Sequence, residues 1–389
     1  MPDMMESPAP ESVLHRLLAA VWDPDGAELP VPVPWAEVMA LARTEGVTPL
    51  LYAALRQTGM TAPERVGTAL AQAYYGLARA NTLRGLELEP VLAALSGVDV
   101  PVLLLKGMAL AETLYDNIAL RPMSDFDLVV HRQDVPVCQE LLTGLGYRSV
   151  DVEVTPGAFL AYRNEQIFAP PKDSQAWVEL HWHLLDVPYY LRHVPMAWFW
   201  ETSRAHRIGS YPIQILGPEA NLLYLSSHLA LHHRFHGLRW FVDLAALTYL
   251  RRDSLDWDRI ARQAQAFELL LTVRETLDRL AGYWPSLPLE DARRCLQALQ
   301  PSPAEQRIFR LLTAEPRSPL LDFYADLVCL PDLPARANFA LRNVFPQPAY
   351  MARRYGVHRG WQLPFFYLYR LGAGFRKLVQ TLPQVIRLG

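Results

Sequence analysis

The sequence predicts an α+β fold, in which one mixed sheet in the middle of the chain is flanked by N-terminal and C-terminal helical regions. Apolar residues recur with the helical period before Val98 and after Pro218, whereas the segment between them contains short apolar runs that are typical of strands. We therefore divide the chain into a helical region (1–95), a core with both strands and helices (96–217) and a second helical region (218–389).

The first region is predicted to be helical because its apolar residues fall on one face at helical spacing. Leu83, Leu86, Leu88 and Leu92, for example, give the last helix of this region a broad apolar face. The helices are expected at Trp35–Ala42, Pro49–Leu55 and Val66–Leu95.

The central region opens with Val102–Leu105, whose length and flanking residues predict a buried strand, and Gly107 then begins a helix. Val135–Leu142 is expected to be a helix that glycines at 144 and 146 close. The further strands are expected at Asp125–Val130, Tyr147–Val154, Gln166–Ala169, Trp177–Trp182 and Pro212–Leu216.

Beyond Pro218 the helical period returns, with helices expected at Asn221–His232, Trp240–Leu250 and Trp257–Leu280. The last segment, 333–389, has nine Arg and Lys and no Asp or Glu, with aromatic residues between them. This basic tail could bind nucleic acid or an anionic membrane surface. We favour the alternative that it packs on the remainder of the chain, which is acidic, because its arginines are spread out.

The composition is that of a packed globular protein, with 389 residues, 51% apolar residues and a net charge of -3. This charge does not suit a chain that binds polyanions over its whole surface. The three cysteines are far apart and form no Cys-x-x-Cys pair, which favours a reducing compartment. We expect neither a signal peptide nor a transmembrane segment, and hence a cytoplasmic protein.

Two aspartates, Asp125 and Asp127, stand two apart in an otherwise apolar strand. The strand period of two places both carboxylates on one face, with Cα atoms roughly 6–7 Å apart. Hard oxygen ligands at this separation can chelate Mg²⁺ or Mn²⁺, as the transfer of a nucleotidyl group requires. The alternative is a strand end whose polar face is solvated.

Residues around the aspartates support a phosphate site. Lys106 and Gly107 lie between a strand and a helix, where backbone N–H groups and a helix N-terminus can meet phosphates. Arg121 adds a cation four residues before Asp125, and Ser124 adds a hydroxyl. We assign Lys106, Gly107, Arg121 and Ser124 to binding of the nucleotide.

A third carboxylate, Glu179, stands in the strand Trp177–Trp182 and shares a face with His181. A charged residue between apolar neighbours is costly to bury without a partner. A metal ion also bound by Asp125 and Asp127 would be such a partner, and an arginine at a sheet edge is the alternative. We take Asp125, Asp127 and Glu179 as the catalytic, metal-binding acids.

These motifs resemble those of the bacterial uncharacterised nucleotidyltransferase family of the DNA polymerase beta-like superfamily. The resemblance rests on strand-Lys106-Gly107-helix, on Arg121-Pro122-Met123-Ser124-Asp125-Phe126-Asp127-Leu128 and on Glu179-Leu180-His181-Trp182, and it spans roughly residues 35 to 290. It implies a polymerase-beta-like core with a small mixed sheet and helices on one side. The chain departs from the superfamily at Gly107-Met108, where Gly-Ser or Gly-Gly is usual, and in the wider spacing to Asp125.

Histidines gather at His228, His232, His233 and His236, close to Asp243. Because histidines four apart share a helix face, His228 and His232 could bind zinc, line the pocket or make structural hydrogen bonds. The resemblance implies that this helix and the next face the catalytic sheet. We place His181, His228, His232 and Asp243 in the substrate pocket.

The function expected from these residues is metal-dependent transfer of a nucleoside monophosphate from an NTP to an unidentified acceptor, which could be a small molecule, a sugar, a peptide or a protein. One alternative is a non-catalytic nucleotide- or partner-binding module on the same fold, which Gly107-Met108 favours. Another is an RNA-modifying transferase that uses the basic tail. We rank it last because no RNA-binding module is recognisable, and nucleic acid is therefore not an expected partner. The pattern does not indicate an oligomeric state.

Overall fold

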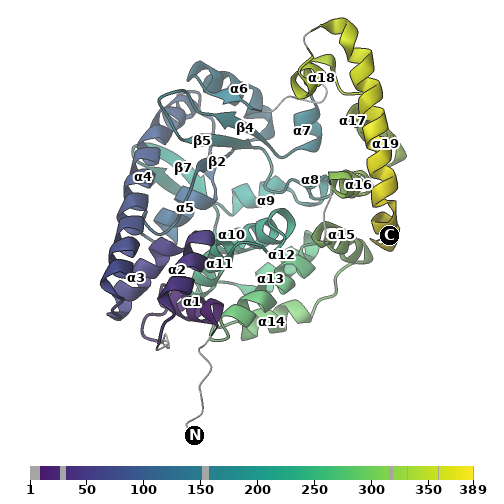
Figure 1. Cartoon of the computed structure of the whole chain (residues 1–389). Helices are drawn as coiled ribbons and strands as arrows, with labels where there is room; N and C mark the ends of the chain where they lie inside the picture. The colour runs from purple at the N-terminus through teal and green to yellow at the C-terminus, as the bar shows by residue number, and fades with distance from the viewer. Residues whose placement is uncertain are drawn as a thin grey trace.

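The computed structural model describes residues 9–26, 32–150, 157–314, 319–330, 332–357 and 359–388. Within them the chain forms an α+β fold around one seven-stranded mixed sheet, as the sequence predicts (Figure 1). The strands are β1 (Leu103–Leu104), β2 (Asp125–Val129), β3 (Arg148–Ser149), β4 (Glu165–Ala169), β5 (Trp177–His181), β6 (Arg204–Ile208) and β7 (Tyr211–Ile215).

The sheet has the order β3-β4-β5-β2-β1-β7-β6. The pairs β2/β5 and β1/β7 are parallel, and the remaining neighbours are antiparallel. In the β2/β5 pair, Asp127 lies opposite Glu179. The parallel register therefore sets two of the predicted acids side by side at the middle of the sheet.

One face of the sheet is covered by α4 (Glu64–Ser96), α5 (Lys106–Thr113) and α6 (Val135–Gly144) (Figure 1). Phe126 and Leu128 of β2 are buried in a core with Val91 and Leu92 of α4. Their burial fixes the pleat of β2, so that Asp125 and Asp127 must face the other way.

On the other face, Leu103, Leu105 and Val129 join a second core that the N-terminal and C-terminal helices build together. Helices thus cover both faces, and the expectation of helices on one side is wrong, because these apolar side chains also need burial. The helices of this second layer include α1 (Pro10–Ala19), α2 (Trp35–Thr44), α3 (Thr48–Thr58), α10 (Pro218–Ser227), a π-helical turn η2 (His228–His232), α11 (Leu238–Leu250), α12 (Trp257–Ala266), α13 (Leu270–Tyr283), α14 (Glu290–Gln297) and α15 (Pro303–Thr313).

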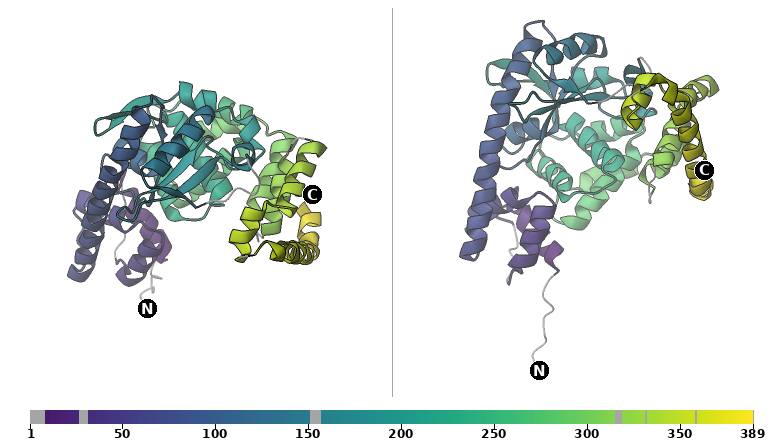
Figure 2. Two further views of the ribbon diagram at one scale, coloured as in Figure 1. Left: turned by 90° about the horizontal axis from the view of Figure 1, so that it is seen from above. Right: turned by 45° about the horizontal axis from the view of Figure 1, so that its top comes forward.

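The last helices stand at one side of the molecule, next to the end of the second core, as Figure 2 shows in two further views. They are α16 (Pro319–Cys329), α17 (Leu333–Val344), α18 (Pro348–Tyr355), the short η3 (Gly360–Gln362) and α19 (Leu363–Leu388). The remaining short elements are η1 (Arg132–Asp134), α7 (Ala158–Tyr162), α8 (Tyr190–His193) and α9 (Met196–Glu201). In the part of the chain that is described, no helix combines the length and apolar character needed to cross a bilayer.

Several elements differ from the expected ones. The helix predicted at Trp257–Leu280 is interrupted between α12 and α13, where Glu268 takes a positive φ of 56°. The helix predicted at Asn221–His232 ends in the wider turn η2. Strand β6 was not predicted, because the polar residues of Arg204–Ile208 carry no apolar alternation. The predicted strand Tyr147–Val154 is β3 at Arg148–Ser149, and its residues 151–154 lie outside the described part.

Candidate active site

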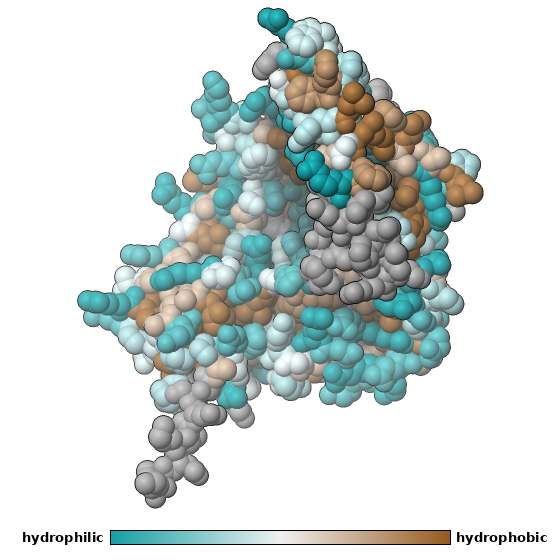
Figure 3. Space-filling view, turned by 45° about the vertical axis from the view of Figure 1, so that its right-hand side comes forward, coloured by the Kyte–Doolittle hydropathy of each residue, from teal (hydrophilic) through white to brown (hydrophobic). Residues whose placement is uncertain are grey.

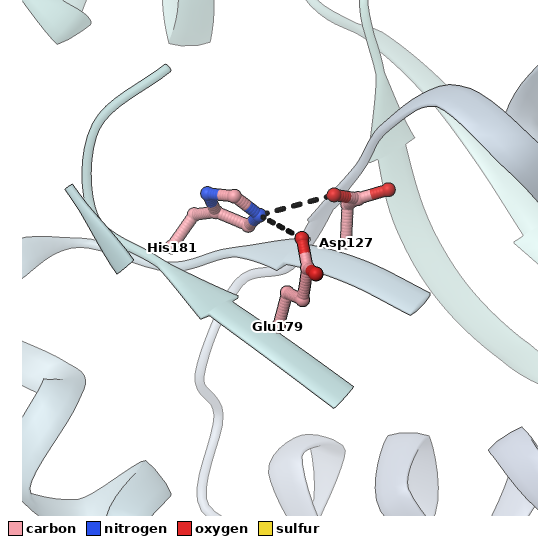
Figure 4. A group of neighbouring side chains, drawn as sticks. All are labelled: Asp127, Glu179 and His181. Atoms are coloured by element: carbon pink, nitrogen blue, oxygen red, sulfur yellow. Dashed lines mark hydrogen bonds and ion pairs between the residues drawn. The ribbon is translucent and has the colours of Figure 1, made fainter. Parts of the chain in front are cut away.

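Three side chains from the two central parallel strands converge on one face of the sheet (Figure 4), in a cavity that Tyr224 and Ser227 of α10 also line. Asp127 comes from β2, and Glu179 and His181 come from β5. One ligand atom from each lies within 4.8 Å of the other two. Two carboxylates and an imidazole at this separation are suitable donors for one small divalent cation.

Asp127 is almost fully enclosed, with 3% of its surface exposed. Its Oδ1 lies 2.7 Å from Lys106 Nζ and 3.1 Å from His181 Nε2. Burial alone would raise the pKa of Asp127, but the cation at Lys106 and the bond with His181 hold it below its ordinary value. Asp127 is therefore ionised at neutral pH, as a metal ligand must be.

His181 lies among three carboxylates. Its Nδ1 is 3.1 Å from Glu165 Oε2, and its Nε2 is 3.6 Å from Glu179 Oε2. Burial lowers the pKa of His181, yet Glu165 and Asp127 raise it to about 10. Burial also raises the pKa of Glu179. Without a metal ion, His181 is thus protonated, and its positive charge stabilises the three carboxylates beside one another.

These residues line a cavity of about 300 Å³ between the sheet and the helices α10 and α11. Asp125 and Ser124, which precede Asp127 in the chain, also line the cavity. Burial followed by the charge of Asp127 raises the pKa of Asp125. Asp125 is not one of the three residues whose ligand atoms lie closest, so the tight group contains His181 in addition to two of the three predicted acids.

Lys106 and Gly107 line the same cavity at the start of α5. Lys106 takes a positive φ of 40°, which turns the chain from β1 into the helix. A Cβ on Gly107 would meet the Cβ of Met123 at 3.0 Å. The glycine therefore lets the helix start approach the segment that precedes β2.

Arg121 is held by residues behind the cavity wall. Its Nε donates to Asp243 Oδ2 at 2.8 Å, and Asp243 Oδ1 accepts from the hydroxyl of Tyr115 at 2.8 Å. Asp243 has no exposed surface and is not among the residues that line the cavity, whereas Arg121 is. Asp243 thus orients a cavity residue and does not itself face the predicted substrate pocket.

The π-helical turn η2 and the residue after it form the cavity wall that lies opposite the sheet. His228, His232 and His233 all line the cavity, and His233 Nε2 lies 3.0 Å from His228 Nε2. Burial and the charge of Lys106 hold the pKa of His228 well below its ordinary value, so His228 is neutral. His232 instead lies 3.5 Å from Asp186 and its pKa is raised by that carboxylate. Within the described residues this helix provides no group of three close metal ligands, which leaves the zinc alternative without support.

Several residues of the cavity were not predicted as site residues. Arg239 and Trp240 of α11 line it, and the guanidinium groups of both Arg239 and Arg121 stack on the Trp240 ring, at 4.6 and 4.7 Å from its centroid. Glu165 contributes to the cavity from β4. The alternation of β4 could have indicated Glu165, but no local pattern indicates that Arg239 meets Arg121 across more than a hundred residues.

The fold and the cavity together define a mixed α+β protein with a buried acidic group that could hold a divalent cation, faced by arginine, lysine and histidine. Residues 32–284 match the family model described as uncharacterised nucleotidyltransferase, and the chain belongs to this family. No curated protein and no solved structure matches the chain.

Proposed function

We propose that this protein is a divalent-metal-dependent nucleotidyltransferase, which moves a nucleoside monophosphate from an NTP to an acceptor that is still to be identified. The observation that carries the proposal is the pairing of Asp127 with Glu179 across two parallel strands, inside a cavity whose other walls carry cations. The proposal includes a polymerase-beta-like core at about residues 96–217. It also includes a bacterial, cytoplasmic location, on the strength of the family resemblance and of three cysteines that stand far apart in the sequence.

Asp127 and Glu179 would hold the cation, Mg²⁺ or Mn²⁺, and Asp125 would join them from the same strand face. When bound, the cation neutralises charge on the phosphates and lowers the pKa of an acceptor hydroxyl. The donor set favours this role because carboxylate oxygens are hard ligands that both ions accept. The imidazole of His181 makes Mn²⁺ the better probe.

The cationic wall is suited to the triphosphate. Lys106, Arg121 and Arg239 all line the cavity. Two of their buried nitrogens, Nη2 of Arg121 and Nε of Arg239, have no hydrogen-bond partner in the described part of the protein. A buried guanidinium nitrogen without an acceptor is costly, and a phosphate oxygen would relieve this cost. Ser124 and the backbone at Gly107 also line the cavity and would contact the phosphates as well.

The aromatic wall is suited to a base or an acceptor ring. Trp240 stacks on His233 with ring centroids 4.4 Å apart, and both line the cavity. Planar rings of this kind stack on nucleobases with little dependence on base identity. His228 stays neutral and His232 is paired with Asp186, so these two histidines offer hydrogen bonds to a substrate.

The second candidate is a nucleotide-binding module without catalysis. The contact of Lys106 Nζ with Asp127 Oδ1 at 2.7 Å favours it, because a lysine there takes a position that a metal ion would use. Gly107-Met108, where the superfamily usually has a second small residue, favours it as well. The two candidates share nucleotide binding and differ in turnover.

Binding is tested first by thermal unfolding with Mn²⁺ and a non-hydrolysable NTP analogue. A ligand that binds only the folded state raises the Tm. The wild-type protein should gain several degrees, and the Asp125→Asn/Asp127→Asn variant should lose this gain. The matched control is Glu290→Gln/Asp291→Asn, which changes two exposed acids of α14. An equal gain in the aspartate variant would contradict the proposed site.

A further inference from the structure

The last helix, α19, presents an unusual outer face. Phe365, Leu368, Tyr369 and Phe375 are 61–69% exposed, and Trp361, just before the helix, is 64% exposed. Single exposed apolar residues are ordinary, but a continuous group of large ones marks a binding surface. Figure 3 shows hydrophobic side chains gathered over this side of the molecule.

Helical geometry places these side chains on one stripe. The spacings from Phe365 to Leu368, Tyr369 and Phe375 are three, four and ten residues, which keep them within one face of a helix. The inner face is occupied by the half-buried Phe366, Tyr367 and Arg370. Phe366 stacks on Tyr355 of α18, Tyr367 bonds to Pro346 between α17 and α18, and Arg370 bonds to Asn343 of α17. α19 is therefore folded against its neighbours through one face and leaves a largely aromatic face exposed, on which, within the described chain, Tyr369 alone of the four contacts a ring of another α-helix, Tyr355 of α18.

The segment that carries this face is basic. Between residues 333 and 389 there are nine Arg and Lys and no Asp or Glu. Arg353, Arg354, Arg359 and Arg376 are exposed. The expectation that the tail packs on the remainder of the chain is met where α17 and α19 contact α16 and where Arg353 donates to the carbonyl of Val150. Most of the stripe and its cations face outward.

We propose that α19 and η3 dock this protein onto an anionic membrane surface. A helix with Trp, Phe and Leu on one face and arginines around it lies in the lipid headgroup region, with the aromatic rings in the acyl boundary. Each arginine near an anionic bilayer adds attraction that salt screens. The helix lies on the membrane and does not cross it, because the opposite face is bound to α16 and α18.

The experiment is co-sedimentation of the full-length protein with vesicles of phosphatidylcholine alone or with 30% phosphatidylglycerol. The wild type should pellet with the anionic vesicles, and less so with the neutral ones or at 0.5 M NaCl. The Phe365→Ser/Leu368→Ser/Phe375→Ser variant should bind roughly tenfold or more weakly, since three large apolar groups no longer insert. Arg354→Gln/Arg376→Gln should weaken binding to anionic vesicles only.

The matched control is Leu83→Ser/Leu86→Ser, which removes two exposed leucines of α4 and should pellet like the wild type. Pelleting of the α19 serine variant at the wild-type level would overturn the proposal. Two other results would also overturn it. In the first, the wild type does not bind the vesicles but forms a dimer, and the serine variant does not form this dimer. In the second, the wild type binds single-stranded RNA and does not bind the vesicles. Nucleotide binding should be unchanged in all of these variants, which separates this inference from the proposed function.

Discussion

Oδ1 of Asp127 is contacted by two cationic groups at once, Lys106 Nζ at 2.7 Å and His181 Nε2 at 3.1 Å. All three side chains are almost fully enclosed, with 10% or less of each exposed. A metal ion that binds this oxygen of Asp127 must therefore share it or displace one of its two partners. This competition gives the site a measurable signature.

The Lys106→Met variant should bind Mn²⁺ more tightly than the wild type and bind an NTP less tightly. Removing one partner of a buried ion pair costs about 3–5 kcal/mol, so we also expect a lower Tm in EDTA that Mn²⁺ partly restores. Calorimetric titration with each ligand measures both affinities. Lys172→Met, at an exposed position, is the control. Mn²⁺ affinity equal to or below that of the wild type would rule out the competition.

The Glu165→Gln variant should weaken Mn²⁺ binding by roughly 10–100-fold, as is usual when the carboxylate behind a metal-binding histidine is lost. The reason is that Glu165 contacts His181 Nδ1 at 3.1 Å and thereby orients Nε2 toward Asp127. Electron paramagnetic resonance of free Mn²⁺ measures this affinity. Glu112→Gln breaks a similar glutamate–histidine pair with His206, outside the cavity, and should leave Mn²⁺ affinity unchanged. Equal losses of Mn²⁺ affinity in both variants would show that the loss comes from a less stable fold and not from the missing contact between Glu165 and His181.

The Asp243→Asn variant should lose about 3–5 kcal/mol of unfolding free energy, because it leaves the buried Arg121 without its counter-ion. NTP affinity should fall as well, since Arg121 is no longer fixed. Tyr115→Phe removes only the hydroxyl bond to Asp243 and should cost about 1 kcal/mol. Urea unfolding and nucleotide titration measure the two effects. Wild-type nucleotide affinity in the Asp243→Asn variant would show that Asp243 does not position Arg121 for nucleotide binding.

The stability of the protein should fall below pH 6.5 partly through His228. In the folded protein, burial and Lys106 keep the pKa of His228 well below 6.5, whereas the unfolded chain takes up a proton near that pH. The unfolded state thus binds more protons, and stability decreases as the pH falls, by up to about 1.4 kcal/mol per pH unit for one histidine. Urea unfolding at pH 7.5, 6.0 and 5.0 should give a shallower dependence for His228→Gln. Parallel dependences in the two proteins would contradict this role.

The sequence predicted the α+β class and the elements that carry the acids because these depend on local periodicity. Alternation in Asp125–Val129 and in Trp177–His181 decides which side chains share a face. It does not decide which strands are neighbours. The parallel register that sets Asp127 opposite Glu179 is a long-range property, and the sequence could offer it only through the family resemblance.

Other features of the site could not be predicted from local sequence patterns. His181 was placed in the substrate pocket and does line the cavity, but its ligand atom also lies within 4.8 Å of those of Asp127 and Glu179, which depends on the pairing of β2 with β5. Asp243 was placed in the pocket because the family resemblance implies that its helix faces the sheet, but Arg121 and Tyr115 hold it behind the wall. Arg239 enters the cavity through the packing of α11 on the sheet, which no spacing in the chain indicates.

Catalysis by this site is tested most directly by transfer of label from an α-³²P NTP. The protein is incubated with Mn²⁺ or Mg²⁺, each of the four NTPs and a host-cell extract as the source of acceptor. The wild type and the Glu112→Gln control should label an acceptor or the protein itself. Asp127→Asn and Glu179→Gln should each be slower by on the order of a thousandfold, because they lose the groups that hold the metal. Labelling by Glu179→Gln at the wild-type rate, or wild-type nucleotide binding with no transfer to any acceptor, would contradict catalysis by this site.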